Sequence, residues 1–573
     1  MPICRRSFLK STAATGVAAC MPNLRADAQP QLKVALMSDT HVTRVRNSVE
    51  RTRMAMELFK RLGVDVMAHV GDLADWHYPE AYGYYREALD AVFPPQGKRP
   101  ALIYAFGDHD ALNPAAQKNP REKRVLDRLW SFADMKERLG IDHGYSDIKV
   151  IAGYPFLIFP QTLGAISLED YERMIADTCT KFPEGPVFLL EHPPAYQTTY
   201  NSCFQDPRRR AVLDKFPRLV HICGHKHASV KNELCIWQGA FTAVQVSCLQ
   251  KWYGLNVGSR IVGKESWGVC VMEVFPDRLV FRRYDVRDGS EYRPDAPWTV
   301  RLPYVPSAQP AYSIATRAAT EREVSFPSSA KVDVSTDASP FRSVAVRFPT
   351  VTRSEDVFLY RVEIARKNAV GAWEVFSGTD VFGDFYEIPA ARTGTLGCSF
   401  SSSLFESGAD YRFAVTPVGF FGKMSKSLSA EWRAPEKAPT EVVWKCDSPM
   451  DLKVGGSAKV VRDGDWLSCG PGEFRISLPP DALRGAKGDE FRFSVEMQTL
   501  QENVAYGVAF GVTKAMWSRG LLTPLGDSGF RRYVLTERMA SGKLPDWAFK
   551  FEGQGKLKVR FRSLKVERIA AAR

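Results

Sequence analysis

Residues 32–41 read LKVALMSDTH, an apolar run that ends in an aspartate and a histidine. The run Leu32 to Met37 predicts a buried strand, because it is almost continuously apolar and polar residues follow it. Asp39 and His41 come directly after this strand. In open α/β sheets, ligand-binding groups collect at the carboxyl ends of the strands. The stretch therefore suggests the first strand of an α/β domain, with a functional site at its end.

Alternating helices and strands follow this stretch. Asn47 makes a capping-box-like helix start with Glu50, and Gly63 is a natural C-terminal cap for the same helix. A second strand is predicted over Val64 to Val70. Further strands are expected at residues 101–106, 187–190, 219–223 and in a hairpin over 268–284. This alternation predicts one α/β domain over residues 29–303.

Polar clusters come directly after five of these predicted strands. They are Asp39-x-His41, Gly71-Asp72-x-x-Asp75, Gly107-Asp108-His109-Asp110, Glu191-His192-Pro193 and Gly224-His225-Lys226-His227. One such cluster alone would be weak evidence, because a single histidine beside a strand is usually structural. Carboxylates and imidazoles without a thiolate suit transition-metal ions such as Mn, Fe or Zn. Together the clusters indicate a metal centre, and all nine histidines of the chain fall in this region.

In these motifs, residues 32–300 resemble the calcineurin-like metallophosphoesterase superfamily. The resemblance implies a four-layer α-β-β-α sandwich that binds two divalent or trivalent transition-metal ions. It assigns Asp39, His41 and His227 to one ion, Asp108, His192 and His225 to the other, and Asp72 to both. The implied reaction is hydrolysis of a phosphomonoester or phosphodiester by in-line attack of a hydroxide that bridges the two ions. Asp72 would then be catalytic as the bridging ligand, and His109 as the general acid.

One residue departs from the family pattern. The usual asparagine of the third motif is Asp108 here, so Asp39, Asp72 and Asp108 together would carry three negative charges. Two divalent ions would then leave one positive charge, where an asparagine would leave two, and attraction for phosphate should be weaker. Asp75 stands where purple acid phosphatases have a tyrosine ligand, which argues against that class.

Several neighbouring residues have expected supporting roles. Asp75 and Asp110 should orient metal-bound imidazoles through the second ring nitrogen. Three other histidines are expected to be structural, namely His69, His143 and His221. The aromatic residues Tyr196, Tyr200 and Phe204 are candidates for a wall of the substrate pocket. Cys223, Cys248 and Cys270 are predicted core thiols, and a disulfide between Cys179 and Cys203 is left open.

The N-terminal segment resembles a twin-arginine export signal, with Arg5-Arg6 before a weakly apolar run. Cleavage after Ala28 would make residues 1–28 the signal peptide, and a lipid anchor at Cys20 is the open alternative. The apolar run is too short for a permanent membrane anchor. We therefore expect an exported protein, periplasmic or at the cell surface, with no membrane span in the mature chain.

Two proline-containing linkers divide the remaining sequence, one near residues 303–310 and one near 434–439. The strand pattern of residues 311–433 resembles a fibronectin type III sandwich. Residues 440–573 suggest a jelly-roll-like sandwich similar to galactose-binding modules. We thus expect two all-β domains after the α/β domain, and these could bind a glycan or a cell-surface polymer.

The composition excludes fibrous and disordered classes, because 45% of the 573 residues are hydrophobic and 25% are charged. The net charge of +12 is compatible with an anionic partner, and a phosphate-ester substrate is the expected one. A nucleic-acid partner is not favoured, because there is no long basic run with interleaved aromatic residues. Two alternatives remain at this level: an extracytoplasmic nuclease or nucleotide phosphodiesterase, and a surface glycan-binding protein with a vestigial metal site.

Overall fold

The computed structural model describes residues 29–569 with gaps. Not described are residues 1–28, 44–47, 76–78, 112–130, 162–165, 203–205, 247, 250, 253–263, 266, 308, 337–342, 436–440, 448–453, 457–458, 471, 479–488, 502–508, 513–520, 523–526, 539–547, 554–556 and 570–573. The predicted export signal and Cys20 therefore lie outside the described residues. Within the described part of the chain, no helix is both long and apolar enough to cross a membrane.

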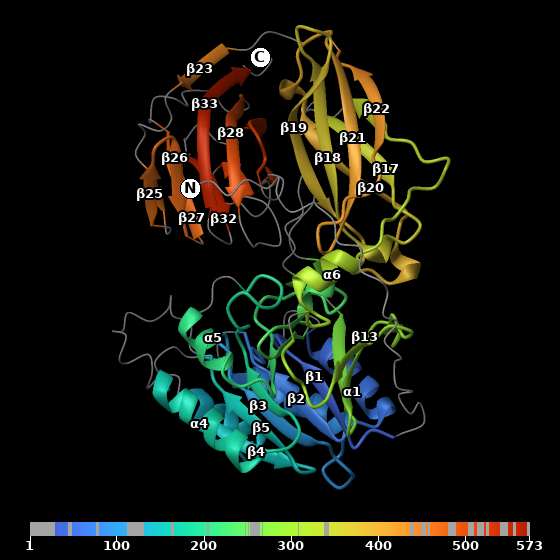
Figure 1. The fold of residues 1–573 in the computed structure, drawn as a ribbon, viewed down its shortest axis with the longest axis vertical. Coiled ribbons are helices and arrows are strands. Elements are labelled where there is room, and N and C mark those ends of the chain that lie inside the picture. Colours follow the sequence, from blue (N-terminus) through green and yellow to red (C-terminus); the bar gives the residue numbers. More distant parts are fainter. Residues whose placement is uncertain are drawn as a thin grey trace.

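The α/β region lies at the bottom of Figure 1. Its first sheet has seven strands. Its parallel strands are β1 (Leu32–Met37), β2 (Val66–Val70) and β3 (Ala101–Ala105). Its antiparallel strands are β12 (Gly268–Val274), β13 (Arg278–Asp285), β14 (Glu291–Tyr292) and β15 (Trp298–Arg301). The helices α1 (Ser48–Leu62) and α2 (Pro79–Val92) belong to this half. The sheet thus includes the predicted hairpin, and α1 ends before Gly63, which has a φ of +65°.

The second sheet has six strands in the order β4-β5-β6-β7-β9-β8. Their bounds are β4 (Asp147–Ile151), β5 (Tyr154–Phe159), β6 (Val187–Glu191), β7 (Leu219–Cys223), β8 (Ile236–Gln238) and β9 (Thr242–Gln245). The helices α4 (Leu168–Lys181) and α5 (Pro207–Leu213) accompany this sheet, and η1 (Glu233–Cys235) is a short 3-10 turn before β8. A separate small ribbon pairs β10 (Lys251–Trp252) with β11 (Lys264–Glu265).

Successive side chains of a strand point to opposite faces of its sheet, so the apolar side chains of the α/β region are divided among three hydrophobic cores. Leu36 of β1 shares one core with Leu190 of the other sheet. Its neighbour Met37 points the opposite way, into a core with Phe59 of α1, while Leu189 packs with Tyr171 of α4. Both faces of the central strands are therefore buried, as their apolar sequences predicted. The predicted mixed α/β fold of the N-terminal region is confirmed.

Strand-rich structure fills the rest of the chain. Sheets of three and four strands are built from β16 (Asp333–Thr336), β17 (Ser343–Pro349), β18 (Val357–Lys367), β19 (Trp373–Phe382), β20 (Thr395–Ser401), β21 (Asp410–Gly419) and β22 (Leu428–Arg433). Two further sheets contain β23 (Glu441–Cys446), β24 (Val454–Gly456), β25 (Val460–Asp463), β26 (Trp466–Cys469), β27 (Gly472–Ser477), β28 (Glu490–Gln501), β29 (Ala509–Val512), β30 (Leu521–Leu522), β31 (Arg531–Arg538), β32 (Ala548–Gly553) and β33 (Leu557–Ile569). We call the unit from β16 to β22 the first sandwich.

A helix interrupts the region that the sequence predicted to be entirely β. The helix α6 (Ile314–Thr320) lies between the α/β region and the strand-rich bodies in Figure 1. Ser313 caps it by accepting a hydrogen bond from the Thr316 amide at 3.1 Å. Arg317 stacks on Phe421 at 4.3 Å and pairs with Glu233. Such a short helix depends on these tertiary contacts, which a local pattern does not contain.

The first sandwich packs against segments that follow β6 and β13. Tyr200, only 2% exposed, shares a core with Phe358 and Phe385 of the sandwich. Across the same junction, Arg287 pairs with Glu387 at 3.0 Å. The prediction that Tyr200 forms a pocket wall is therefore wrong, because the sandwich covers its ring. Tyr196 is only partly buried, and Phe204 lies outside the described residues.

Candidate metal centre

The predicted site residues occupy turns at the ends of β1, β2, β3, β6 and β7. Five of them have a positive φ, namely Asp39 (52°), His41 (40°), Asp72 (54°), His225 (68°) and His227 (46°). L-residues rarely adopt this conformation, and strained backbone of this kind concentrates at functional sites. The rest of the fold therefore holds these turns in an unfavourable backbone conformation, and their side chains lie close together.

Two glycines let the turns approach each other closely. A Cβ at Gly71 would lie 2.4 Å from His192 Nδ1, and one at Gly107 would lie 2.1 Å from Asp72 Oδ1. No side chain fits at such distances without displacing the neighbour. The glycines in these motifs thus make room for Asp72 and His192.

Asp110 ties two of the turns together through their backbones. Its carboxylate accepts hydrogen bonds from the amides of Asp72 (2.9 Å), Ala74 (3.0 Å) and Gly107 (2.9 Å). Burial and then the nearby Asp72 charge raise the pKa of Asp110 to about 7. These bonds show that Asp110 orients the backbone of two turns, a role that the sequence analysis does not predict.

The seven predicted ligand residues come together in two groups that share one carboxylate. One group is Asp39, His41, Asp72 and His227, and the other is Asp72, Asp108, His192 and His225. Within each group, one potential ligand atom per residue lies within 4.8 Å of all the others. The grouping is the one expected from the sequence, with Asp72 in the shared position. Metal binding by these residues stays a prediction.

The polar atoms inside the two groups fit a cation. His192 Nδ1 donates to the Val70 carbonyl at 2.6 Å, and Nε2 faces Asp72 Oδ2 at 3.0 Å. Three buried atoms have no hydrogen-bond partner among the described residues: His192 Nε2, Asp39 Oδ1 and Asp108 Oδ1. Buried acceptors left unpaired are costly. Metal ions at this position would satisfy them, so the residues present fit the pair of ions that the resemblance implied.

The carboxylates of the two ligand groups make this region of the protein favourable for positive charge. Burial opposes ionisation of Asp39, but the neighbouring His227 and His192 hold its pKa well below the usual range. Burial also opposes a charged His192, yet Asp72 and Asp39 outweigh it and raise the pKa of His192 to about 10. The carboxylates therefore create a strongly negative pocket that protons or metal ions would neutralise.

His109 and Asp75 form an adjoining pair. His109 Nδ1 lies 3.0 Å from Asp75 Oδ1, and His41 Nδ1 lies 3.7 Å from the same oxygen. Burial lowers the pKa of His109, but the hydrogen bond to Asp75 and the charge of Asp72 outweigh it and raise the pKa above its usual value. His109 is partly exposed and sits beside the two groups, so it can reach a bound molecule as a proton donor.

The other histidines that the structure describes have structural contacts, as expected. His69 Nε2 lies 3.0 Å from Thr40 Oγ1, and burial lowers the pKa of His69 to about 3. His143 accepts from the Tyr104 amide at 3.2 Å, and His221 lies 3.5 Å from Glu191 Oε2. The predicted core thiols are also buried, namely Cys223, Cys248 and Cys270. Cys179 is a half-buried free thiol, and its suggested disulfide partner Cys203 lies outside the described residues.

One supporting residue was missed by the sequence analysis. Gln161 Oε1 accepts from the Asp108 amide at 3.0 Å and so fixes the turn after β3. Gln161 follows β5, a strand that the sequence analysis did not predict. Recognising the apolar run YPFLIF at residues 154–159 would have placed Gln161 at the same end of the sheet as the ligands.

Comparison with known families gives a match for the N-terminal region. A family model described as calcineurin-like phosphoesterase matches residues 32–229. Among curated proteins, no sequence matches the chain.

Solved structures give weak likenesses. A dimetal phosphatase from Danio rerio is 14% identical, with 48% of this chain and 100% of that chain covered and a TM-score of 0.33. A purple acid phosphatase from yellow lupin seeds is 14% identical, with 47% and 53% covered and a TM-score of 0.32. A predicted phosphoesterase from Streptococcus pneumoniae is 9% identical, with 47% and 97% covered and a TM-score of 0.23. TM-scores this low are no evidence of shared function.

Proposed function

We propose that residues 32–229, which match the calcineurin-like phosphoesterase family model, are a domain of that family and that the chain hydrolyses a phosphomonoester or phosphodiester. The matching family supports a metal-dependent phosphoester hydrolase. The single observation that carries the proposal is the pair of largely buried ligand groups that share Asp72. Mixed oxygen and nitrogen ligands of this kind suit Mn, Fe, Zn or similar ions.

Each group has a separate part in this proposal. The group with Asp39, His41 and His227 would hold one ion, and the group with Asp108, His192 and His225 would hold the other, with Asp72 common to both. When bound, such a pair of ions supplies Lewis acidity toward the phosphoryl oxygens and lowers the pKa of water. Asp75 fixes His109 through Nδ1, and this hydrogen bond favours the protonated ring. His109 can then give a proton to the leaving oxygen.

A substitution at Asp108 tests how the negative charge of the ligand groups affects metal and phosphate binding. We expect Asp108→Asn to retain its metal and at least about a tenth of the turnover, because an amide oxygen can replace a carboxylate oxygen as a ligand. Inorganic phosphate should inhibit this variant more strongly, since one negative charge is removed. Metal analysis, turnover and phosphate inhibition check the prediction. A folded variant without metal and without activity would contradict it.

The substrate class is tested with two synthetic esters. The purified chain from Gln29, loaded with Mn²⁺ or with Fe and Zn, is assayed on p-nitrophenyl phosphate and on bis-p-nitrophenyl phosphate. We expect metal-dependent turnover of at least one ester, and the preferred one identifies a phosphatase or a phosphodiesterase. Two bound ions with no turnover of either ester, or of a wider phosphoester panel, would overturn the proposed activity.

We also propose that the protein is exported and that its β-domains are a fibronectin type III-like unit and a jelly-roll-like unit. The paired arginines and the apolar run of residues 1–28 support export. The arrangement of three strands packed on four supports the first domain assignment. Fusion of residues 1–28 to a reporter, with Arg5 and Arg6 replaced by lysine in a matched control, tests the export signal.

A further inference from the structure

The ring of His227 faces the ligand group that also contains Asp39, His41 and Asp72, which we call the first group. His227 Nε2 lies 3.2 Å from Asp39 Oδ1 and 3.1 Å from His41 Nε2. An imidazole that binds an ion through Nε2 keeps its proton on Nδ1, and this N–H donates to a neighbouring acceptor. That acceptor fixes the tautomer and the orientation of the ring. The group that holds the second nitrogen of His227 therefore influences how the first group binds an ion.

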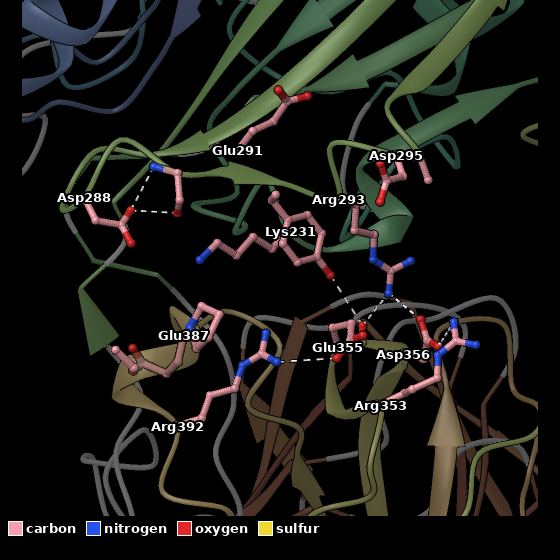
Figure 2. Close-up of a pocket in the computed structure, with 15 residues that line it drawn as sticks. Lys231, Asp288, Glu291, Arg293, Asp295, Arg353, Glu355, Asp356, Glu387 and Arg392 are labelled. Atoms are coloured by element: carbon pink, nitrogen blue, oxygen red, sulfur yellow. Dashed lines mark hydrogen bonds and ion pairs between the residues drawn. The ribbon is translucent and has the colours of Figure 1, made fainter.

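The backbone that follows His227 is anchored at the junction with the first sandwich. Four residues later, Lys231 Nζ lies 2.9 Å from Asp285 Oδ2 and donates to the Tyr386 carbonyl of the sandwich at 3.3 Å. Figure 2 shows Lys231 at the wall of a cleft of about 730 Å³ between the α/β region and the first sandwich. These contacts restrain the main chain, but they do not fix the rotation of the His227 ring about its side-chain bonds.

The thiol of Cys248 contacts the His227 ring. A hydrogen bond links the two side chains. Cys248 pairs with Ser38 in a short parallel bridge, and Ser38 directly precedes the ligand candidate Asp39. Cys248 is fully buried, yet among the described residues it belongs to neither ligand group. The thiol therefore lies beside the first group without being one of its candidate ligands.

The segment that carries Cys248 is held in place by α1. The carbonyl of the next residue, Leu249, accepts a hydrogen bond from Arg51 Nη1 at 3.2 Å, and the Arg51 guanidinium stacks on Trp267 at 4.4 Å. A thiol sulfur so placed can accept from an imidazole N–H, although more weakly than the carboxylate or carbonyl oxygen that usually holds a metal-bound histidine. The contact between Cys248 and His227 is thus a fixed feature of the fold.

We propose that Cys248 is a positioning residue of the metal centre: its sulfur accepts a hydrogen bond from His227 Nδ1 and so holds Nε2 toward the ion of the first group. Nδ1 is the nitrogen assigned to the thiol because Nε2 faces the ligand group. The inference rests on the proposed function only in that the first group binds a metal ion. Loss of the sulfur would leave a buried N–H unpaired and the ring without its stop. The sequence analysis identified Cys248 as a core thiol only.

The test compares two replacements of Cys248 in the full mature chain. Cys248→Val is close to the thiol in volume but offers no acceptor, whereas Cys248→Ser keeps an acceptor. Competition with a chelator measures the affinities for Zn²⁺ and Co²⁺, and the absorption spectrum of bound Co²⁺ reports the geometry of its ligands. We expect Cys248→Val to bind one of the two ions at least about tenfold more weakly, with an altered Co²⁺ spectrum. Cys248→Ser should recover most of this loss.

The matched control is Cys270→Val, at an equally buried thiol of β12, and it should bind both ions as the wild type does. His227→Ala shows which of the two affinities belongs to the first group, and Cys248→Ala replaces Cys248→Val if the latter does not fold. The inference is overturned if the folded variant without an acceptor binds both ions as tightly as Cys270→Val, or if Cys248→Ser binds as weakly as Cys248→Val. A wild type that binds two ions but hydrolyses no ester refutes the proposed function alone, and one that binds no ion overturns both.

Discussion

Asp72→Asn will lower phosphoesterase turnover by about a thousandfold or more and will reduce the bound metal below two ions per chain. Asp72 is the only residue common to both ligand groups among the described residues. Its Oδ2 lies 3.0 Å from His192 Nε2 and 3.7 Å from His41 Nε2. Asparagine has nearly the same size but lacks the negative charge that two adjacent cations would share. One substitution should therefore weaken both ion sites at once.

The control for this experiment is Asp463→Asn, a matched change at an exposed surface pair with Lys558. It should leave turnover and metal content unchanged, because exposed ion pairs contribute little. Metal analysis by mass spectrometry and steady-state kinetics on the preferred ester supply the measurements. If Asp72→Asn folds, keeps two ions and retains more than a tenth of the turnover, Asp72 is not the shared ligand.

The position of Asp72 could be predicted because each motif is local. Every candidate ligand lies within five residues of a predicted strand, and parallel strands bring their carboxyl ends to one edge of a sheet. Strand assignment and residue type were therefore enough to indicate which side chains would meet. The family resemblance added the division into two groups, which spacing alone does not give.

Contacts between residues that lie far apart in the sequence could not be predicted in this way. The sequence predicts that Asp110 orients an imidazole, but it does not reveal that the carboxylate accepts from three backbone amides in two different turns. Tyr200 followed a site motif and suggested a pocket wall, but the first sandwich covers it. The helix α6 has too few residues for a helical periodicity and is held by Arg317. In each case the deciding neighbour lies far away in the sequence.

Glu233 is the clearest example of such a long-range contact, and Glu233→Gln should lower the free energy of unfolding by about 3–5 kcal/mol. The Glu233 carboxylate is buried and accepts from Arg283 Nη1 at 2.8 Å and from Trp298 Nε1 at 2.9 Å. It also pairs with Arg317 of α6, so it connects the α/β region to the segment that leads into the first sandwich. Loss of its charge leaves the fully buried Arg283 without its anion, which is the costly way to break a buried pair.

The pH dependence distinguishes this ionic role from simple packing. Burial opposes ionisation of Glu233, but Arg283, Arg317 and Arg293 outweigh it and hold its pKa well below the usual 4.5. A carboxyl with a lowered pKa stabilises the fold above its unfolded-state pKa, and this contribution is lost as the pH falls. The stability difference between wild type and Glu233→Gln should therefore be complete at neutral pH and shrink as the pH falls below about 4.5.

Thermal and denaturant unfolding of both proteins across this pH range measure the effect. The matched control is Glu441→Gln, at a 61% exposed ion pair with Arg568, and it should cost less than about 1 kcal/mol. A loss for Glu233→Gln that stays constant with pH would mean that the side chain acts through packing and not through its charge. A loss no larger than that of the control would mean that Arg283 finds another partner, and that the junction between the α/β region and the first sandwich does not depend on this carboxylate.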